Sequence, residues 1–333
     1  MPATWPQAMR LLDVGPHCYA VVNDRNRLCD SNSGLVNAGG GLVIDTQCDL
    51  AHARRMIELF GTVWRALPER VAITHEDVDH VWGNQLFPGA QIIAQQKIHE
   101  RLPHAADPRH LQRLQHAAKS WLSRIVLRLS NPGLLKLADQ MAEDYDFDNI
   151  EFVPPNVSFD QRYELNLNGL EVHLIHVGPG HQWGDTLVHV PAEGVLFSGD
   201  VVFRQCTPIG WAGSFAGWQR SLMLVAELDP AVIVPGHGPI CGLEGPRELS
   251  AYLDYVRGEA RRAFDEGLSA IDAAKRIDFG PYDRWHAPGR LYLNVERAYR
   301  EFRGESFDTP WNVAGALARV HEVAKAHGIE TTF

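Results

Sequence analysis

The most constraining feature of the sequence is the run THEDVDH at residues 74–80. It places two histidines and two carboxylates within six positions: His75, Asp77, Asp79 and His80. Imidazole nitrogens and carboxylate oxygens are the ligands that zinc, iron and manganese take in proteins. The apolar residues 71–74 indicate a short β-strand before the motif. We therefore expect these side chains to lie where a strand ends, so that they can converge on a small ion.

Three later segments repeat this arrangement of a strand followed by a potential ligand. His181 follows the β-type run 171–177, Asp200 follows 195–197, and His237 follows 232–234. Each histidine comes directly after a glycine, which lets the backbone turn sharply and approach an ion closely. One histidine or Gly-Asp pair at a strand end is usually structural. Four such segments in this order favour a single metal centre.

Size and composition limit the class of protein. The chain has 333 residues, of which 45% are apolar and 22% charged, so one large or two small globular domains are expected. The net charge is −10 and no block of Lys and Arg occurs, which argues against a nucleic-acid partner. No apolar run reaches the ~20 residues that span a bilayer, and no membrane partner is predicted.

The cysteines and the first residues predict a cytoplasmic protein. The five cysteines are scattered, odd in number and never spaced as Cys-x-x-Cys. This pattern argues for a reducing compartment and against a disulfide framework or a cysteine zinc site. The first ten residues have neither the basic head nor the apolar stretch of a signal peptide.

Residues 11–243 alternate between strand and helix patterns. In the first half we expect strands and turns over 11–47, a helix over 49–64, a strand over 71–74, a short helix over 80–87 and a strand over 91–94. In the second half we expect strands over 163–167, 171–177, 186–190 and 194–197, a helix over 216–228 and a strand over 231–234. Two successive halves of this kind favour an α/β layered fold with helices outside two sheets.

Two further regions have helical composition. Residues 95–147 are rich in Leu, Ala, Arg, His and Gln, and we interpret them as an insertion of two or three helices around the break Asn131-Pro132-Gly133. The insertion is either an extra packing layer or a lid over a pocket. Residues 244–333 form a C-terminal helical extension, which either covers the site or supplies the face of a homodimer.

Taken together, the four segments resemble the metallo-β-lactamase superfamily over about residues 15–243. The resemblance implies an αβ/βα four-layer sandwich with two divalent metal ions between its sheets. It implies a first metal held by His75, Asp77 and His181. It implies a second metal held by Asp79, His80 and His237, with Asp200 bridging the two.

Asp77 departs from the family pattern His-x-His-x-Asp-His, which has a histidine at that position. A carboxylate there occurs in flavodiiron proteins, but nothing after His237 has the phosphate loop of their flavodoxin domain. With two divalent ions, two carboxylates and a hydroxide leave one positive charge, and Asp77 removes it. We expect zinc, with iron or manganese as alternatives, and a bound water less acidic than in strong catalytic zinc sites.

The resemblance implies hydrolysis of an activated acyl group by a metal-bound hydroxide, with Asp79 as the expected proton acceptor. The substrate would be a small-molecule or carrier-bound thioester, ester or lactone. Residues 74–86 and 207–213 are similar to second-ring cyclase/thioesterases of aromatic polyketide pathways, so a polyketide cyclase is the first alternative. A non-catalytic metal-binding protein is the second. Hydrolysis of β-lactams is disfavoured, because those enzymes are usually shorter and exported.

Aromatic residues near the motifs suggest a substrate pocket. Trp82, Trp183 and Trp211 each lie within a few residues of a motif and could form a wall for a flat or apolar substrate. Alternatively, one or two of them pack the loops beneath the sheets. His286, beside Trp285, could reach the pocket or lie on the surface.

Overall fold

The computed structural model describes residues 8–105, 107–307 and 309–333, and its centre is a pair of β-sheets. The first sheet has seven strands whose spatial order follows the chain. They are β1 (Met9–Asp13), β2 (Cys18–Asn23), β3 (Ser33–Val36), β4 (Leu42–Ile44), β5 (Arg70–Ile73), β6 (Gln91–Gln95) and β7 (Val157–Phe159). Strands β1 to β4 pair antiparallel and β4 to β7 pair parallel. The parallel half needs crossover connections, and helices supply them.

The second sheet has five strands in the order β12-β11-β10-β9-β8. They are β8 (Arg162–Leu167), β9 (Leu170–His176), β10 (Thr186–Val190), β11 (Val195–Phe203) and β12 (Val232–His237). Only the pair β11 and β12 is parallel, and β10 turns into β11 through the short 3-10 turn η3 (Pro191–Glu193). The strands predicted over 186–190 and 194–197 are therefore confirmed, and they pair as a hairpin.

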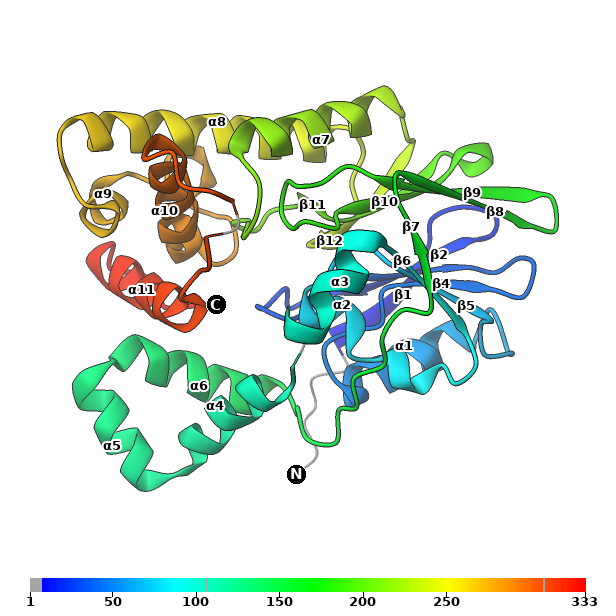
Figure 1. The fold of residues 1–333 in the computed structure, drawn as a ribbon, viewed down its shortest axis with the longest axis horizontal. Helices are drawn as coiled ribbons and strands as arrows, with labels where there is room; N and C mark the ends of the chain where they lie inside the picture. The colour runs from blue at the N-terminus through cyan, green and yellow to red at the C-terminus, as the bar shows by residue number, and fades with distance from the viewer. Residues whose placement is uncertain (1–7, 106, 308) are drawn as a thin grey trace.

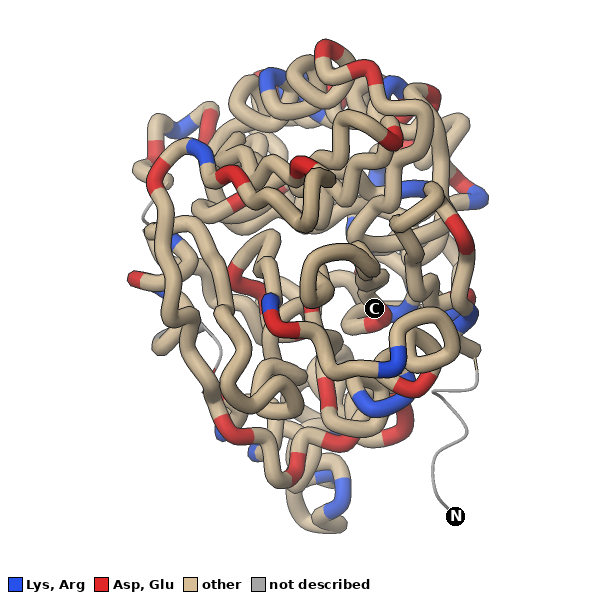
Figure 2. The backbone as a smooth tube through the Cα atoms, turned by 90° about the vertical axis from the view of Figure 1, so that its right-hand side faces the viewer, with Lys and Arg blue, Asp and Glu red and all other residues tan. Residues whose placement is uncertain are grey.

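Helices cover the outer faces of both sheets (Figure 1). Helix α1 (Leu50–Phe60) contacts β1 and β2, while α7 (Phe215–Glu227) and α8 (Glu244–Asp265) contact β11. Between the sheets lies a core of buried apolar side chains, among them Ile44 from β4 and Phe197 from β11. This helix, sheet, sheet, helix order is the four-layer sandwich that the sequence predicts. Seen from the side, acidic and basic residues are interspersed along the chain (Figure 2).

The described residues of the insertion form four helices, one more than the upper number predicted. They are α3 (Gln96–Ala105), α4 (Arg109–Lys119), α5 (Trp121–Ser130) and α6 (Pro132–Asp144). The extra boundary lies at Ser120, whose extended backbone ends α4 and whose hydroxyl caps α5. The break at Asn131 is present, and its side chain caps α6 by accepting a hydrogen bond from the Leu134 N–H.

The C-terminal extension continues with α9 (Ala270–Arg276), α10 (Leu291–Phe302) and α11 (Val313–Ala326). Helix α11 packs against α6 of the insertion, so two regions far apart in the sequence lie side by side (Figure 1). The contact is close, because a Cβ added at Gly133 would lie 2.1 Å from the backbone oxygen of Ala318.

Three predicted element boundaries are wrong. The helix predicted over 49–64 ends at Phe60, because Gly61 caps it. The helix predicted over 80–87 is instead α2 (Val78–Val81) followed by the 3-10 turn η2 (Asn84–Leu86). Asp200 does not end its strand, since β11 continues to Phe203. Among the described residues, no helix combines the length and the apolar composition needed to cross a bilayer.

An added methyl group should have opposite effects on stability at two helical glycines, one at the contact of α6 with α11 and one in open space. Gly133→Ala would force a methyl group against Ala318 and should lower the free energy of unfolding by about 1–3 kcal/mol. Gly258→Ala lies within α8 with open space around the new methyl, and should raise the free energy of unfolding by roughly 0.5–1 kcal/mol. Denaturant titration measures both. A neutral or stabilising Gly133→Ala would contradict the contact.

Candidate metal centre

The seven predicted ligand residues come from four separate segments and meet at one edge of the two sheets. The loop after β5 and the short helix α2 carry His75, Asp77, Asp79 and His80. The loop between β9 and β10 carries His181, β11 carries Asp200, and His237 is the last residue of β12. Six of the seven residues are buried, and Asp77 is the exception, with 23% of its side chain exposed.

Strands β11 and β12 approach each other closely at this edge. A Cβ added at Gly236 would lie 1.8 Å from Oδ1 of Asp200. Gly236, the residue before His237, must therefore lack a side chain, because the Asp200 carboxylate occupies the space that a Cβ would need. The register between the strands shifts twice around this point, which brings Phe203 opposite His237.

Two triads of ligand-type atoms form within this edge. In the first, His75, Asp77 and His181 have their ligand atoms within 4.8 Å of one another, and His181 Nε2 lies 3.1 Å from Asp77 Oδ2. In the second, Asp79, His80 and His237 meet the same limit, and His237 Nε2 lies 3.2 Å from Asp79 Oδ2. The four potential ligands of the motif at 74–80 are thus divided between two neighbouring potential metal positions.

Asp200 lies between the two triads. Its Oδ2 is 3.8 Å from His75 Nε2 and 3.4 Å from His181 Nε2 of the first triad. It is also 3.5 Å from His237 Nε2, while Oδ1 is 3.4 Å from His80 Nε2 of the second. One carboxylate therefore faces histidines from both triads, as a bridging ligand would.

Several buried polar atoms at this edge have no hydrogen-bond partner. They are Nε2 of His75, Nε2 of His80, Oδ1 of Asp200 and Nδ1 of His237. Buried polar atoms are almost always hydrogen bonded, and a group of exceptions that points to one place needs a specific explanation. Divalent cations bound by imidazole and carboxylate would satisfy the first three, so the residues fit the metal ions that the fold implies.

The second ring nitrogen of three histidines has a fixed partner, which orients Nε2 toward the centre. His80 Nδ1 donates to Asp45 at 2.7 Å, and His181 Nδ1 donates to the carbonyl of Ile209 at 2.6 Å. His75 Nδ1 donates to the hydroxyl of Thr74 at 3.0 Å, and that hydroxyl donates to Asp45. Metal-binding histidines in proteins are held in the same way.

The carboxylates at the centre outweigh burial and raise the pKa of both His80 and His181. Burial lowers the pKa of His80, but Asp79, Asp45 and Asp200 outweigh burial and raise that pKa to about 10. His75 has the opposite shift, because burial and the neighbouring histidines lower its pKa. Carboxylates that draw a proton onto a fully buried imidazole also attract a metal cation.

Two carboxylates that hold the 178–185 loop were not singled out in the sequence analysis. Asp185 accepts hydrogen bonds from the backbone N–H groups of Gly180, His181 and Gln182 at 3.0, 2.7 and 2.9 Å. Glu76 accepts from the N–H of Gly184 at 3.1 Å. Burial, with Asp77 and Asp185 nearby, raises the pKa of Glu76 to about 7. Glu76 belongs to the motif at 74–80 but is not one of the predicted ligands.

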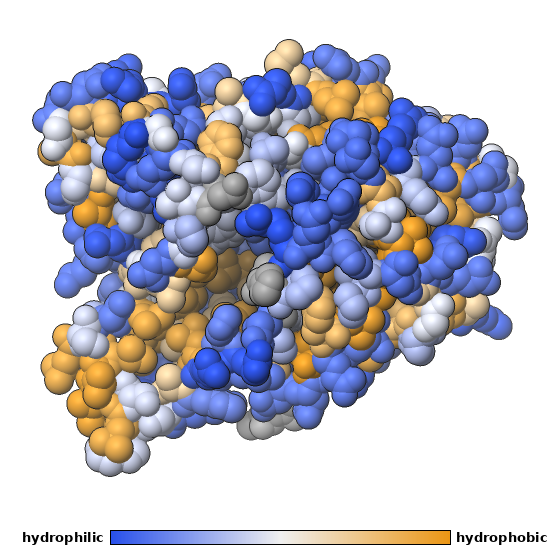
Figure 3. Space-filling model, in the orientation of Figure 1, coloured by the Kyte–Doolittle hydropathy of each residue, from blue (hydrophilic) through white to orange (hydrophobic). Residues whose placement is uncertain are grey.

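The metal centre opens into a cavity of about 840 Å³. Its lining includes Asp77, Asp79, Asp200 and His237, together with apolar residues from α4, α6 and α11. In the space-filling view a hollow with hydrophobic walls lies between the insertion and the C-terminal helices (Figure 3). The insertion and the extension therefore form walls of one cavity.

The three predicted tryptophans all contribute to the lining, but not equally. Trp183 and Trp211 are half-buried, and Trp211 packs edge-on against Trp311 with ring centroids 5.4 Å apart. Trp82 is only 1% exposed and packs against Phe147, so it mainly supports the cavity from beneath.

His286 is not among the residues that line the cavity, and it is half-buried rather than exposed on the surface. Its backbone exchanges hydrogen bonds with Gln205 and Thr207, and its Nε2 is buried without a partner. Burial, together with Arg290 and Arg27, lowers the pKa of His286 to about 4. The position of His286 next to Trp285 in the sequence does not indicate that it lies outside the cavity lining.

Arg290 was missed by the sequence analysis. It lines the cavity and is 1% exposed, and its NH1 group donates to the carbonyl of Thr207. Its Nε and its second terminal nitrogen are buried and have no partner. Burial lowers the pKa of Arg290 from its ordinary value. A single arginine without a motif has no signal in the sequence.

Comparisons with known proteins agree with this geometry. The family model of the metallo-beta-lactamase superfamily matches residues 26–237. A metallo-beta-lactamase type 2 from Bacteroides fragilis is 29% identical over 121 residues, which is 35% of this chain and 48% of that protein.

Two solved structures have a similar fold. The stereoselective inverting sec-alkylsulfatase Pisa1 from Pseudomonas sp. is 18% identical, with a TM-score of 0.62 over 92% of this chain and 52% of that chain. A metallo-beta-lactamase family protein from Thermus thermophilus is also 18% identical, with a TM-score of 0.60 over 87% of this chain and 94% of that one. The chain spans about half the length of the curated relative and of the alkylsulfatase.

The layered fold and the clustered histidines and carboxylates agree with one family. The chain belongs to the metallo-beta-lactamase superfamily, whose model matches 26–237.

The position of Asp45 predicts a role in metal affinity. Asp45 accepts hydrogen bonds from His80, from the Thr74 N–H and from the Thr74 hydroxyl. Asp45→Asn keeps the size of the side chain and tolerates the local φ of 59°. We expect it to lower metal affinity about 10–100-fold, measured by competition with a chelator.

Asp24→Asn is the matched control for this variant, because Asp24 is half-exposed and pairs with Arg10 away from the centre. Its metal affinity should equal that of the unmodified protein. Unchanged affinity in Asp45→Asn would show that Asp45 does not position a ligand.

Proposed function

We propose that this protein is a metal-dependent hydrolase that cleaves an activated acyl group, such as a thioester, an ester or a lactone, attached to an apolar chain. The observation that carries the proposal is the position of the metal centre. Two triads of ligand-type side chains, joined by Asp200, lie at the end of a cavity whose walls are largely apolar.

We infer two divalent ions, held by residues from both triads. His75, Asp77 and His181 would hold the first and Asp79, His80 and His237 the second, with Asp200 shared. Zinc fits this set, and Asp77 makes iron or manganese reasonable alternatives. When bound, the ions would supply a nucleophilic hydroxide at neutral pH and polarise the bond to be cleaved.

The role of Asp79 is better described as that of a ligand than that of a base. Burial raises its pKa, but His80 and His237 outweigh burial and lower the pKa to about 2. A carboxylate with so low a pKa holds a proton poorly at neutral pH. Asp79 therefore stays ionised and can orient a water molecule at the cavity face of the centre.

Asp77 differs from the other carboxylates in its partners. Its Oδ2 faces His181 at 3.1 Å, and its Oδ1 accepts a hydrogen bond from the side-chain amide of Gln182. The amide shares part of the negative charge that Asp77 adds to the centre. Gln182 therefore fixes which oxygen of Asp77 is directed at His181.

The cavity walls favour a substrate with an apolar chain. Leu111 and Leu114 of α4 and Leu137 of α6 form one side, while Val313 and Leu317 of α11 form the other. These residues belong to the insertion and to the C-terminal extension. We infer that both regions act as the lid of a binding site for a small-molecule or carrier-bound acyl group.

Sulfate ester hydrolysis is a second candidate, favoured by Arg290. The two unpartnered nitrogens of this buried arginine offer donors to an anionic group in the cavity. The sec-alkylsulfatase with a similar fold also aligns over 92% of this chain. A sulfate ester and an acyl group linked to an acidic carrier would each fill this position.

A substrate panel tests the proposed reaction. Acyl-CoA, lactone, p-nitrophenyl ester and secondary alkyl sulfate substrates should be assayed after reconstitution with zinc, manganese or iron. We expect turnover of at least one acyl substrate, rising with chain length because the cavity is apolar, and its loss after chelation. Inert esters and lactones, together with cyclisation of a poly-β-keto chain, would contradict hydrolysis.

Arg290→Met tests whether the buried guanidinium binds an anionic part of the substrate. Hydrogen bonds to charged groups contribute enough that kcat/KM for an anionic substrate should fall about 10–100-fold. A neutral p-nitrophenyl ester should be much less affected. Arg284→Met, at an exposed position in the same segment, is the control. An equal loss for neutral and anionic substrates would contradict this role, and circular dichroism checks the fold of each variant.

A further inference from the structure

Helix α5 carries an apolar stripe that faces solvent. Trp121 is 69% exposed and Leu129 is 83% exposed, and Leu122, Ile125 and Val126 are also exposed. Their spacing places all five on one face of the helix. The space-filling view shows them as a hydrophobic projection at the lower left (Figure 3), where α5 lies in Figure 1. A continuous exposed stripe of this kind marks an interaction surface.

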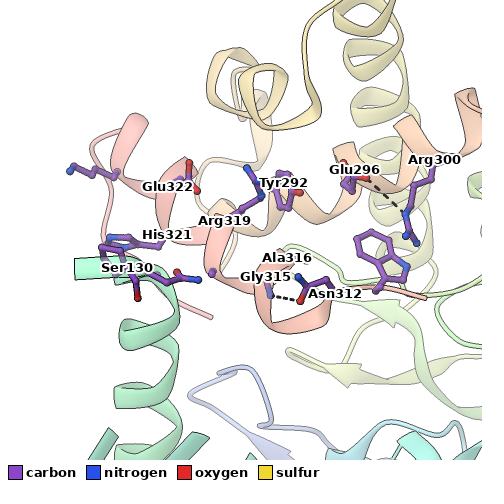
Figure 4. A pocket seen from close by; sticks show the side chains of 16 residues that line it. Ser130, Tyr292, Glu296, Arg300, Asn312, Gly315, Ala316, Arg319, His321 and Glu322 are labelled. Atoms are coloured by element: carbon purple, nitrogen blue, oxygen red, sulfur yellow. Dashed lines mark hydrogen bonds and ion pairs between the residues drawn. The ribbon is translucent and has the colours of Figure 1, made fainter. Parts of the chain in front are cut away.

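The opposite side of α5 belongs to the substrate cavity. Leu127, which points away from the stripe, lines the cavity together with Leu134 of α6. The C-terminal end of the helix is different in character. Ser130 borders a separate cavity of about 590 Å³ whose lining includes Glu296, Arg300 and Arg319 (Figure 4). The apolar surface is therefore confined to the outer face of α5.

The charge around the stripe is unusual for this chain. Residues 109–138 contain six Lys and Arg and no Asp or Glu, although the whole chain has a net charge of −10. Arg109 and Arg124 form ion pairs with Asp107 and Asp139, which flank this segment, and Arg113 lines the cavity. Lys119, Arg128 and Lys136 remain as exposed basic residues. Arg128 lies next to the apolar stripe on α5 itself. An apolar face bordered by basic residues is typical of helices that lie in the interface of a membrane.

The charge of this surface also favours one of two possible binding partners, a second copy of the chain or an anionic membrane. A symmetric contact with a second copy would bring two basic segments together, and like charges there would repel. An anionic lipid surface complements the same residues. We propose that α5 docks on an anionic membrane surface, with the stripe inserted at the level of the headgroups. Docking of this kind needs no spanning helix, and it does not rest on the proposed hydrolysis.

Co-sedimentation with lipid vesicles tests the proposal. The full chain should bind vesicles of phosphatidylglycerol and phosphatidylcholine, bind pure phosphatidylcholine much more weakly, and dissociate as salt is raised. Val126→Ser with Leu129→Ser should abolish binding. Arg128→Gln should weaken binding to the anionic vesicles about fivefold, the usual effect of one basic residue near such a surface.

Met223→Ser is the matched control, since Met223 is 61% exposed on α7, away from the stripe. It should bind vesicles like the unmodified protein. Size-exclusion chromatography with light scattering adds a second measurement. A dimer that Val126→Ser with Leu129→Ser converts to a monomer, without vesicle binding, would assign the stripe to a second copy and overturn the proposal. A monomer that binds no vesicles would also overturn it.

Discussion

The rest of this structure depends on the mutual repulsion of the carboxylates that meet at one edge of the sheets. Asp77, Asp79 and Asp200 lie within a few ångströms of the same group of histidines, and Asp45 lies directly behind them. Among the protein groups, His80 compensates part of this charge, because the carboxylates raise its pKa to about 10. Metal cations compensate the same charge more completely. The strands, loops and helix caps around this edge hold the carboxylates close to one another.

Backbone groups hold the ligand residues in place as much as side chains do. Asp185 binds three consecutive N–H groups of the loop that carries His181, and Gly236 leaves room for Asp200. Glu76 ties the same loop back to the motif through Gly184. The fold itself therefore holds the ligand side chains close together.

Local patterns predicted helices outside two sheets and four segments with potential ligands at strand ends, and the family resemblance implied the four-layer sandwich and the seven ligand residues. Strand periodicity, glycines before histidines and the dense motif at 74–80 are visible without the fold. The position of His286 and the role of Arg290 could not be predicted, since each depends on how the C-terminal helices pack across the site. The fourth helix of the insertion was missed because Ser120 interrupts a continuous helical composition without a proline or glycine. The domain boundaries at 95–147 and 244–333 stay predictions.

The insertion and the extension give this member of the superfamily its particular cavity. Helices α6 and α11 meet at Gly133, and together they enclose an apolar space above the metal centre. The proposed binuclear centre requires two ions that share Asp200. Elemental analysis of the metal-loaded protein measures this directly, beside a His237→Ala variant. Two ions per chain, reduced to one in the variant, are predicted. One ion per chain in the unmodified protein, unchanged in the variant, would contradict a binuclear centre.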